Sequence, residues 1–247
     1  MSASVKSAVR VLQVLEYFDS IRRAANMTEI ARGLGYPLSS TSMLLQSMME
    51  HGYLEQDAQR AYVPTPRVTL LGSWVAPQLA PDSDILRMME EIGEKTGQTI
   101  VLATASESLA RYIHVVPATK TLRMHIAPGT TRQLATSGFG RLFLSSRSNE
   151  EIRRIVFRHN QQTVDDATQL SLQAVYKDLQ AIRSKGYAIS LDKITEGVGV
   201  VATHLPEFTS ASPMAVGIGG PSRDIRIHST EFIDLLKDGI KRYCGDL

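Results

Sequence analysis

Apolar residues recur at helical spacing through the first fifty residues of the chain. The first amphipathic stripe comprises Ala8, Val11, Leu12, Leu15 and Phe18. A short helix over residues 28–34 follows, with Thr28 as its N-cap and Gly35 as its stop. Pro37 then interrupts the helical pattern, because proline cannot continue a helix. A third helix is expected over residues 39–51.

Two short strand-like segments come next, at residues 53–55 and 61–63. The polar turn between them contains Asp57 and Arg60. Three helices and a hairpin, with the last two helices joined by a tight turn, are typical of a winged helix-turn-helix. The pattern therefore predicts a DNA-binding domain over residues 1–65.

A strongly apolar helix is expected from Pro66 to about residue 79, with Thr65 as its cap. Its composition indicates that it packs against another surface, and the proline-containing residues 80–84 end it. We therefore assign residues 66–83 to a linker helix.

Helices and strands follow one another irregularly through residues 84–247, which predicts an α+β domain. Helices are expected at residues 84–96, 140–146, 149–157, 171–185 and 229–243. Strands are expected at residues 99–105, 111–116, 121–127, 187–191, 199–205 and 214–219.

Composition limits the classes of protein that the chain fits. The 247 residues carry a net charge of +2, so any nucleic-acid surface must be local. No apolar run approaches the roughly 18 residues that span a bilayer, which predicts no membrane partner. The N-terminus has no signal-peptide cleavage site, and Cys244 is the single cysteine. These features predict a cytoplasmic protein.

No catalytic or metal-binding motif stands out. The six histidines show no HExxH or HxH spacing, and one cysteine cannot form a cysteine-rich zinc site. There is no GxSxG nucleophile motif, and Cys244 lies too close to the C-terminus to be framed as a nucleophile. The sequence therefore predicts that the protein is not an enzyme and has no cofactor and no metal.

Glycines mark two candidate ligand-binding regions. Residues 197–202 match GxGxxA but continue as a strand, and Gly217 and Gly219 lie on another strand, so the two strands could line one cavity. Residues 134–145 place Ser137 before a glycine-containing helix start, where free N–H groups could bind a carboxylate or phosphate. An ordinary capped helix explains that segment equally well.

Arginines occupy the edges of the predicted winged helix-turn-helix rather than the third helix. They are Arg22, Arg23, Arg32, Arg60 and Arg67. At these positions they could meet DNA phosphates. A winged helix that binds another protein remains the alternative.

The chain resembles the IclR family of bacterial transcriptional regulators. The resemblance rests on SVKSAVRVLQVLEYF, MTEIARGLGYPLSSTSMLLQSMMEHGYL, LATSGFGRLFLS, IRSKGYAISLDKITEGVGVVATHLP and MAVGIGGP, which occur in the family's order. It implies a winged helix-turn-helix, a GAF-like effector-binding domain and a homodimer or homotetramer on operator DNA. A sensor or enzyme that uses its winged helix to dock a protein is the alternative.

The resemblance also implies site residues. With the flanking arginines, the expected DNA-binding residues are Arg22, Arg23, Thr28, Ser39, Ser40, Thr41, Ser42, Gln46 and Arg60. The expected effector-binding residues are Leu122, Met124, Gly138, Phe139, Ser190, Val198, Val200, Gly217 and Gly219. Val200 stands where many relatives have a cysteine, which argues against a zinc-binding pocket. An apolar or aromatic carboxylate is the expected small-molecule effector, with its carboxylate at residues 137–140.

Overall fold

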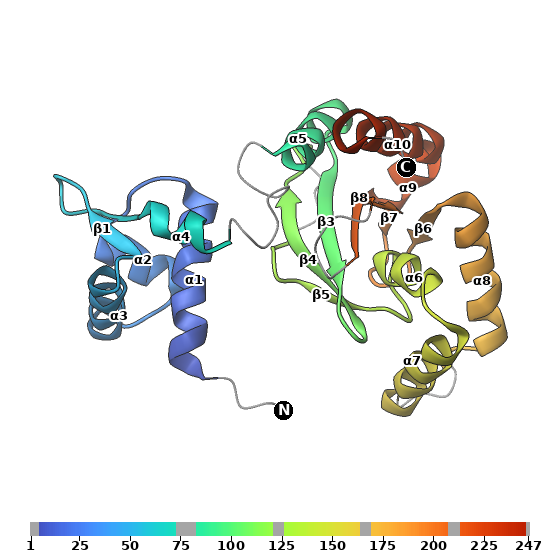
Figure 1. Ribbon diagram of the computed structural model, residues 1–247, viewed down its shortest axis with the longest axis horizontal. Coiled ribbons are helices and arrows are strands. Elements are labelled where there is room, and N and C mark those ends of the chain that lie inside the picture. The colour runs from blue at the N-terminus through green and yellow to red at the C-terminus, as the bar shows by residue number, and fades with distance from the viewer. Residues whose placement is uncertain (1–4, 73–82, 121–125, 164–168, 207–212, 246–247) are drawn as a thin grey trace. The chain divides into compact units, whose positions relative to one another are not determined.

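The computed structural model describes residues 5–72, 83–120, 126–163, 169–206 and 213–245. Contacts divide the chain into two compact units, residues 1–77 and residues 78–247 (Figure 1). We call them the N-terminal unit and the C-terminal unit. Each has its own hydrophobic core, as expected for separate domains.

The N-terminal unit has the predicted order of helices and strands. Its elements are α1 (Lys6–Ile21), α2 (Met27–Leu34), α3 (Leu38–Glu50), β1 (Leu54–Gln56), β2 (Tyr62–Pro64) and α4 (Pro66–Gly72). Val14, Phe18, Ile30 and Leu45 are buried together where α1, α2 and α3 meet. The amphipathic stripes of the three helices therefore share one small core.

The expectation that Thr28 caps α2 is wrong. The N-cap is Asn26, whose side-chain oxygen accepts a hydrogen bond from the Glu29 backbone N–H at 2.9 Å. Asn and Thr both serve as N-caps, and Asn26 already has the extended backbone that the position needs. Thr28 is instead an exposed residue in the first turn of the helix.

One carboxylate shapes the turn between β1 and β2. Asp57 Oδ1 accepts hydrogen bonds from the backbone N–H groups of Gln59 at 2.9 Å and Ala61 at 2.8 Å. Arg60 adopts a left-handed backbone with φ of 61°. That conformation is uncommon for a residue with a side chain, so Asp57 fixes how Arg60 is presented at the tip of the hairpin.

The start of α4 is fastened to the N-terminal unit. Thr65 Oγ1 donates to the Gly52 carbonyl at 2.6 Å, and its backbone N–H donates to the Tyr53 carbonyl at 3.0 Å. The Arg67 guanidinium lies 5.0 Å from the centre of the Tyr53 ring. The predicted continuation of this helix beyond Gly72 lies outside the described residues.

The C-terminal unit is an α+β domain, as predicted. Its helices are α5 (Asp84–Thr96), α6 (Gly138–Ser145), α7 (Asn149–Gln162), α8 (Leu172–Lys185), α9 (Ser222–Ile227) and α10 (Ser229–Cys244). Its strands are β3 (Thr99–Ala105), β4 (Leu109–Val116), β5 (Thr131–Gln133), β6 (Tyr187–Leu191), β7 (Val198–His204) and β8 (Met214–Pro221). The strands form one antiparallel sheet in the order β5-β4-β3-β8-β7-β6.

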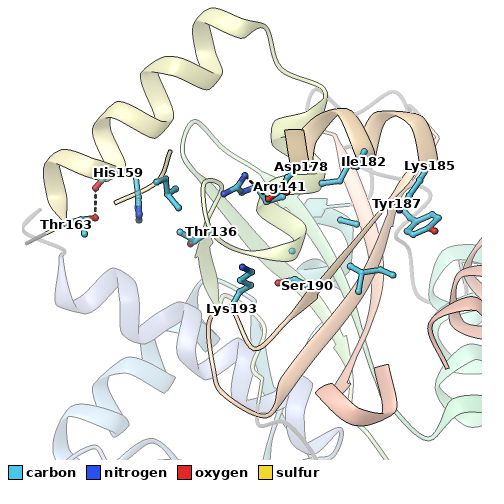
Figure 2. A pocket seen from close by; sticks show the side chains of 15 residues that line it. Thr136, Arg141, His159, Thr163, Asp178, Ile182, Lys185, Tyr187, Ser190 and Lys193 are labelled. Carbon is cyan, nitrogen blue, oxygen red and sulfur yellow. Dashed lines mark hydrogen bonds and ion pairs between the residues drawn. The ribbon is translucent and has the colours of Figure 1, made fainter. Parts of the chain in front are cut away.

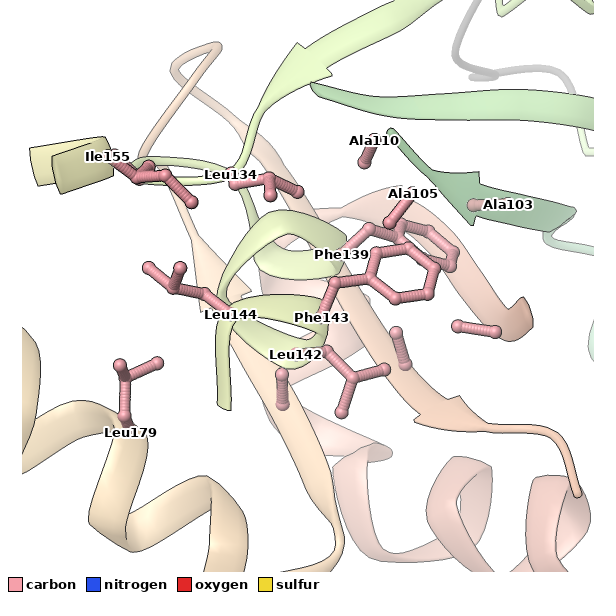
Figure 3. Close-up of a cluster of buried hydrophobic side chains, with 14 of the residues drawn as sticks. Ala103, Ala105, Ala110, Leu134, Phe139, Leu142, Phe143, Leu144, Ile155 and Leu179 are labelled. Atoms are coloured by element: carbon pink, nitrogen blue, oxygen red, sulfur yellow. The ribbon is translucent and has the colours of Figure 1, made fainter. Parts of the chain in front are cut away.

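Helices cover both faces of this sheet (Figure 1). Ile100 and Leu102 of β3 join the core under α5 and α10, whereas Val101 and Ala103 join the core under α6. This alternation follows from the two-residue period of a strand, and it explains why β3 reads as a continuous apolar run. Figure 3 shows the core under α6, in which Phe139 and Phe143 of that helix are central.

Two short elements of the C-terminal unit were not predicted. β5 has three residues, of which Arg132 pairs with Ala110 of β4, and α9 is a six-residue polar helix. The expected strand over residues 121–127, with Leu122 and Met124, falls largely outside the described residues. Neither of these two residues can therefore be placed in the site below.

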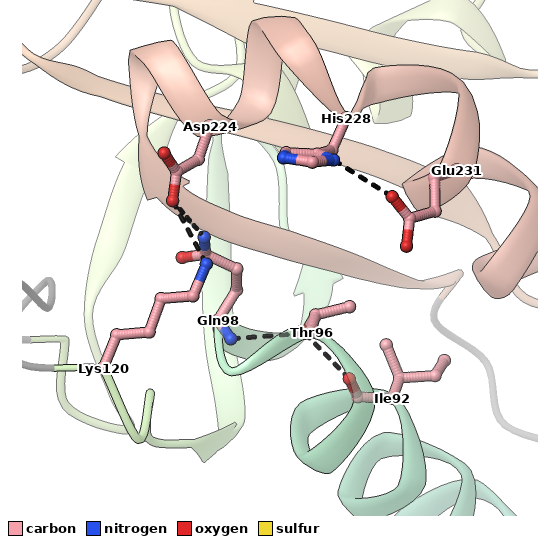
Figure 4. Close-up of polar contacts among 7 residues, drawn as sticks. All are labelled: Ile92, Thr96, Gln98, Lys120, Asp224, His228 and Glu231. Carbon is pink, nitrogen blue, oxygen red and sulfur yellow. Dashed lines mark hydrogen bonds and ion pairs between the residues drawn. The ribbon is translucent and has the colours of Figure 1, made fainter.

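A polar cluster links Gln98, the residue before β3, to α9 (Figure 4). Gln98 is buried, and its Nε2 donates to Asp224 Oδ2 at 2.8 Å. Lys120 Nζ lies 3.2 Å from the same oxygen. Hydrogen bonds from Lys120 and Gln98 hold the pKa of Asp224 below its usual value. These contacts join segments that are more than a hundred residues apart in the sequence.

Glu91 joins α5 to α10, and it should make the C-terminal unit sensitive to acid. Its carboxylate contacts Lys95, Tyr243 and Arg242, which lower its pKa from 4.5 to about 2. Stability from these contacts is present above the unfolded-state pKa and is lost as pH falls through about 2. We expect Glu91→Gln to lower the thermal midpoint at pH 7 and to make progressively less difference as pH falls toward about 2.

Thermal unfolding of both proteins across this pH range checks the prediction. Glu90→Gln on the same helix is the matched control, because Glu90 is exposed. A constant difference between Glu91→Gln and the parent protein at every pH would contradict it.

Candidate DNA-binding surface and effector cavity

Helix α3 presents a neutral polar face to solvent. Ser39, Ser42 and Gln46 are exposed, and Gln46 Nε2 donates to Glu50 Oε1 at 3.0 Å. Ser40 is half-buried, and its hydroxyl donates to the Pro37 carbonyl at 3.0 Å. Three of the predicted contact residues are thus exposed to solvent, where a nucleic acid could reach them. The Ser40 hydroxyl is already used by the Pro37 carbonyl.

The structure contradicts the expectation that Thr41 contacts DNA. Its side chain is fully buried, and its hydroxyl donates to the Pro37 carbonyl at 3.0 Å. A residue four positions before Leu45 lies on the same side of a helix, so Thr41 faces the core together with that leucine. Leu38 and Met43 are instead the exposed apolar residues of this helix.

Arg22 and Arg23 follow α1 and are both exposed, but each has an acidic partner. Arg22 lies 3.5 Å from Asp19. Arg23 forms a two-pronged ion pair with Glu29, and this contact lowers the pKa of the Glu29 carboxyl. The pair at Glu29 reduces the positive charge that Arg23 offers to a phosphate.

An open hollow lies between the start of α2 and the β1–β2 hairpin. It brings together Thr28, Arg32 and Arg60, with Glu29 on the same wall. A backbone bridge between Ala25 and Tyr62 holds the hairpin against this helix. Residues from two distant parts of the sequence thus form one surface with two arginines.

The candidate effector site begins with a row of residues across the sheet. Ser190 of β6 pairs with Val200 of β7, which pairs with Gly219 of β8, which pairs with Thr99 of β3. Residues paired in this way share one face of an antiparallel sheet. The row lies on the face covered by α6.

Helix α6 begins directly on this row. A Cβ on Gly138 would lie 2.5 Å from Val200 Cγ1 and 2.9 Å from Ser190 Cβ, so only glycine fits here without movement. Ser137 caps the helix, because its Oγ accepts from the Gly140 N–H at 3.0 Å and donates to the Gln133 carbonyl at 2.9 Å. The expected carboxylate position at residues 137–140 is thus partly taken by this cap.

A cavity of about 200 Å³ lies beside this helix start, and we call it the inner cavity. It brings together six of the predicted effector-binding residues, namely Gly138, Phe139, Ser190, Val198, Val200 and Gly219. They come from α6, β6, β7 and β8. The volume suits a small organic molecule rather than a nucleotide or a haem.

The structure contradicts the expectation that Gly217 lines this cavity. A Cβ at Gly217 would lie 2.6 Å from the Val201 backbone oxygen and 2.8 Å from Phe139 Cζ, so β7 and the phenylalanine ring occupy the space that the glycine leaves. Phe139 is buried and packs against Tyr112, with 5.3 Å between ring centres. The missing side chain therefore makes room for an aromatic residue and not for a ligand.

Sequence reasoning missed the charged residues of the inner cavity, Arg132 and Lys193. The Arg132 guanidinium lies 5.9 Å from the centre of the Tyr112 ring, and its Nη1 donates to the Thr131 carbonyl at 3.0 Å. Burial raises the pKa of Tyr112, so this phenol stays neutral. Among the lining residues that the structure describes, none is acidic.

Arg141 of α6 does not supply charge to the inner cavity, because its guanidinium is used elsewhere. Its Nε donates to the Ala135 carbonyl at 2.6 Å, and its Nη1 lies 3.6 Å from Asp178 Oδ2. It lines a different cavity, between α6, α8 and β6.

The described residues contain no cluster of three or more histidine, cysteine, aspartate or glutamate side chains placed to hold a metal. They also contain no helix with the length and apolar character needed to cross a membrane.

Two family models match the chain and together cover most of it. Residues 83–242 match the model of the bacterial transcriptional regulator IclR C-terminal domain. Residues 7–58 match the IclR helix-turn-helix domain. The matched segments correspond to the C-terminal unit with the inner cavity and to the N-terminal unit with α3.

Curated proteins and solved structures agree with the family models. The transcriptional repressor IclR of Escherichia coli is 27% identical over 94% of this chain and 86% of its own length. The acetate operon repressor of Salmonella typhimurium is 25% identical over 90% and 82%.

Among solved structures, an IclR effector domain from Acinetobacter sp. ADP1 has a TM-score of 0.62 at 25% identity, covering 66% of this chain and 95% of that domain. The Thermotoga maritima IclR structure shows the same fold at 18% identity, with a TM-score of 0.62 over 98% of this chain and 99% of its own. The chain therefore belongs to the IclR family of bacterial transcriptional regulators, with a DNA-binding helix-turn-helix domain and a C-terminal effector domain.

Proposed function

We propose that this protein is a cytoplasmic regulator that binds operator DNA as a homodimer or homotetramer and responds to a small organic acid. The proposal that the effector is an acid rests on the inner cavity. Arg132 and Lys193 line it, and none of its described lining residues is acidic. Cationic side chains bind carboxylates through charge-assisted hydrogen bonds, and Arg132 is half-buried here.

The DNA contacts that we propose follow the exposed polar residues of the N-terminal unit. Ser39, Ser42 and Gln46 would meet base edges and phosphates in the major groove, with Ser40 at the helix start. This helix would be flanked by Arg22, Arg23 and Thr28. The hollow beside the β1–β2 hairpin would bind phosphate through Arg32 and Arg60. Because α3 lacks arginine and lysine, half-site spacing would contribute much of the specificity.

The effector that we propose carries an apolar or aromatic body and one carboxylate. Tyr112, Phe139 and Val200 offer apolar and aromatic surface, and Ser190 offers a hydroxyl. The carboxylate would bind Arg132 and Lys193 instead of the helix start, where Ser137 already holds the Gly140 N–H. Ligand binding would change DNA affinity only if the two DNA-binding geometries bind the acid with different affinity.

The proposed phosphate contact of Arg60 gives a direct test. We expect Arg60→Gly to weaken operator binding by about ten-fold and to reduce the salt slope by about one per subunit contact. Glycine suits the left-handed backbone at this position, where φ is 61°, so the hairpin should stay intact. Fluorescence anisotropy with the protein's own upstream DNA, over a salt series, measures both quantities.

Arg158→Ala is the matched control, because Arg158 is an exposed arginine on α7 of the C-terminal unit. It changes the net charge equally but leaves the proposed surface intact. If Arg60→Gly binds DNA with the affinity and salt slope of this control, Arg60 does not contact phosphate.

A further inference from the structure

A second cavity in the C-terminal unit adjoins the effector site described above and shares three lining residues with it. Its volume is about 640 Å³, and we call it the outer cavity. Helix α6 supplies Arg141, α7 supplies His159, α8 supplies Asp178 and Lys185, and the segment after β6 supplies Lys193. Figure 2 shows these side chains arranged around one space.

Arg141 is the unusual residue of the outer cavity. Its side chain is 15% exposed, and the Nε–H is used by the Ala135 carbonyl. Its Nη1 is buried and makes no hydrogen bond, since the nearest carboxylate oxygen, Asp178 Oδ2, is 3.6 Å away. An unsatisfied buried donor on a charged group is costly. An anion in the cavity would meet the exposed part of the Arg141 side chain and offset its charge there.

Asp178 is a weak partner for this guanidinium. Its side chain is 65% exposed, so water competes for the carboxylate and the attraction is small. A bound anion could replace the Asp178 carboxylate beside Arg141. The charge of that anion would then be paired with the guanidinium. The structure therefore contains a cation whose present partner is easily exchanged.

The remaining charges of the outer cavity favour a ligand with two negative groups. Lys185 and Lys193 are exposed lysines on its wall, and Asp178 is its acidic residue among the described lining. His159 adds an imidazole, whose Nδ1 lies 2.5 Å from Gln133 Oε1. A ligand that spans from Arg141 to a lysine would satisfy both ends of the cavity.

The wall between the two cavities is closely packed. Both are lined by Gly138, Ser190 and Lys193, and Gly138 touches Ser190 and Val200 with no room for a side chain. Arg132 belongs only to the inner cavity, and Arg141 belongs only to the outer one. Substitution of Arg132 therefore tests binding in the inner cavity, and substitution of Arg141 tests binding in the outer one.

We propose that the outer cavity is a second ligand site, which binds a small organic dianion between Arg141 and Lys185, the lysine of its wall that the inner cavity does not share. A dicarboxylate and a phosphate monoester share this chemistry. The site would allow a second metabolite to modify the response of the protein to its effector, and any effect of one ligand on the affinity of the other would be reciprocal.

Calorimetric titration of the full chain with succinate and, separately, with glycerol 3-phosphate tests the proposal. We expect one probe to bind and Arg141→Met to weaken it by at least about ten-fold. Asp178→Ala should tighten binding by up to about five-fold, because the competing carboxylate is gone. Asp178 is exposed, so this variant stays folded even if Arg141→Met does not.

Two controls separate this site from the effector site. Arg132→Met should leave binding of the dianion unchanged, and Asp234→Ala removes an exposed carboxylate from α10, which covers the other face of the sheet. Binding of neither probe, a loss on Arg132→Met equal to that on Arg141→Met, or no gain with Asp178→Ala relative to Asp234→Ala would each overturn the proposal.

A spectroscopic readout locates the bound dianion. The chain has six histidines, so a histidine-selective NMR spectrum is simple, and His159→Gln assigns the relevant signal. Burial and the charge of Arg141 lower the pKa of His159. An anion next to Arg141 offsets that charge, so the His159 resonances should shift most. A largest shift at another histidine would place the dianion elsewhere.

Discussion

Replacing Arg132 by methionine should weaken binding of a carboxylate effector by between about ten-fold and a hundred-fold, because hydrogen bonds to charged groups contribute roughly 1.5–3 kcal/mol. Methionine keeps the unbranched shape that lies beside Tyr112 but removes the positive charge. Lys193 is exposed and better solvated, so it should compensate only in part. The acid for this measurement is the best stabiliser from a thermal-shift panel of aromatic and aliphatic acids, and its affinity is determined by calorimetry.

Arg111→Met is the matched control for this effector experiment. Arg111 is an exposed residue of β4 and pairs with Thr131, next to Arg132. The Arg111→Met substitution removes one positive charge, as Arg132→Met does, but it changes no residue that lines the inner cavity. Equal affinities for the two variants would show that Arg132 does not hold the carboxylate.

Leu45→Ala should destabilise the N-terminal unit by about 2–5 kcal/mol and abolish operator binding. Leu45 is fully buried and contacts the small core formed with Val14, Phe18 and Ile30. A unit of this size has only a few kcal/mol of net stability, so loss of this side chain should unfold it. Effector binding by the C-terminal unit should persist.

Urea unfolding followed by circular dichroism checks this prediction, with the two units fitted as separate transitions. Met43→Ala is the control on the same helix, because Met43 is 66% exposed and its loss should change stability by less than about 0.5 kcal/mol. If both variants unfold at the parent's urea concentration, Leu45 is not the centre of this core.

Elements with clear end signals were predictable from the sequence alone. The bounds of α5, β3 and β6 match the expectation, and Ser83 and Gly97 supply the N-cap and the left-handed stop of α5. By contrast, β5 has no pattern of its own and exists because it pairs with β4. The polar α9 likewise depends on its contacts with β7 and β8 rather than on apolar periodicity.

The inner cavity was predictable only in its apolar and glycine-bearing part. Strand alternation and the family resemblance point to Ser190, Val200 and Gly219, because these residues share one row of the sheet. Arg132 and Lys193 lie in a short edge strand and a loop, where a charged residue looks like ordinary solvated surface. Similarly, no local pattern distinguishes the buried Thr41 from its exposed serine neighbours.

The contact between Phe139 and Gly217 bears on how the ligand range of this protein could be re-engineered. Because one ring fills the space above the glycine, a smaller residue at position 139 would open a hollow continuous with the inner cavity. Position 217 offers no such freedom, because a Cβ there would also lie 2.6 Å from the Val201 backbone oxygen. A biosensor library for larger effectors should therefore vary position 139 and keep glycine at position 217.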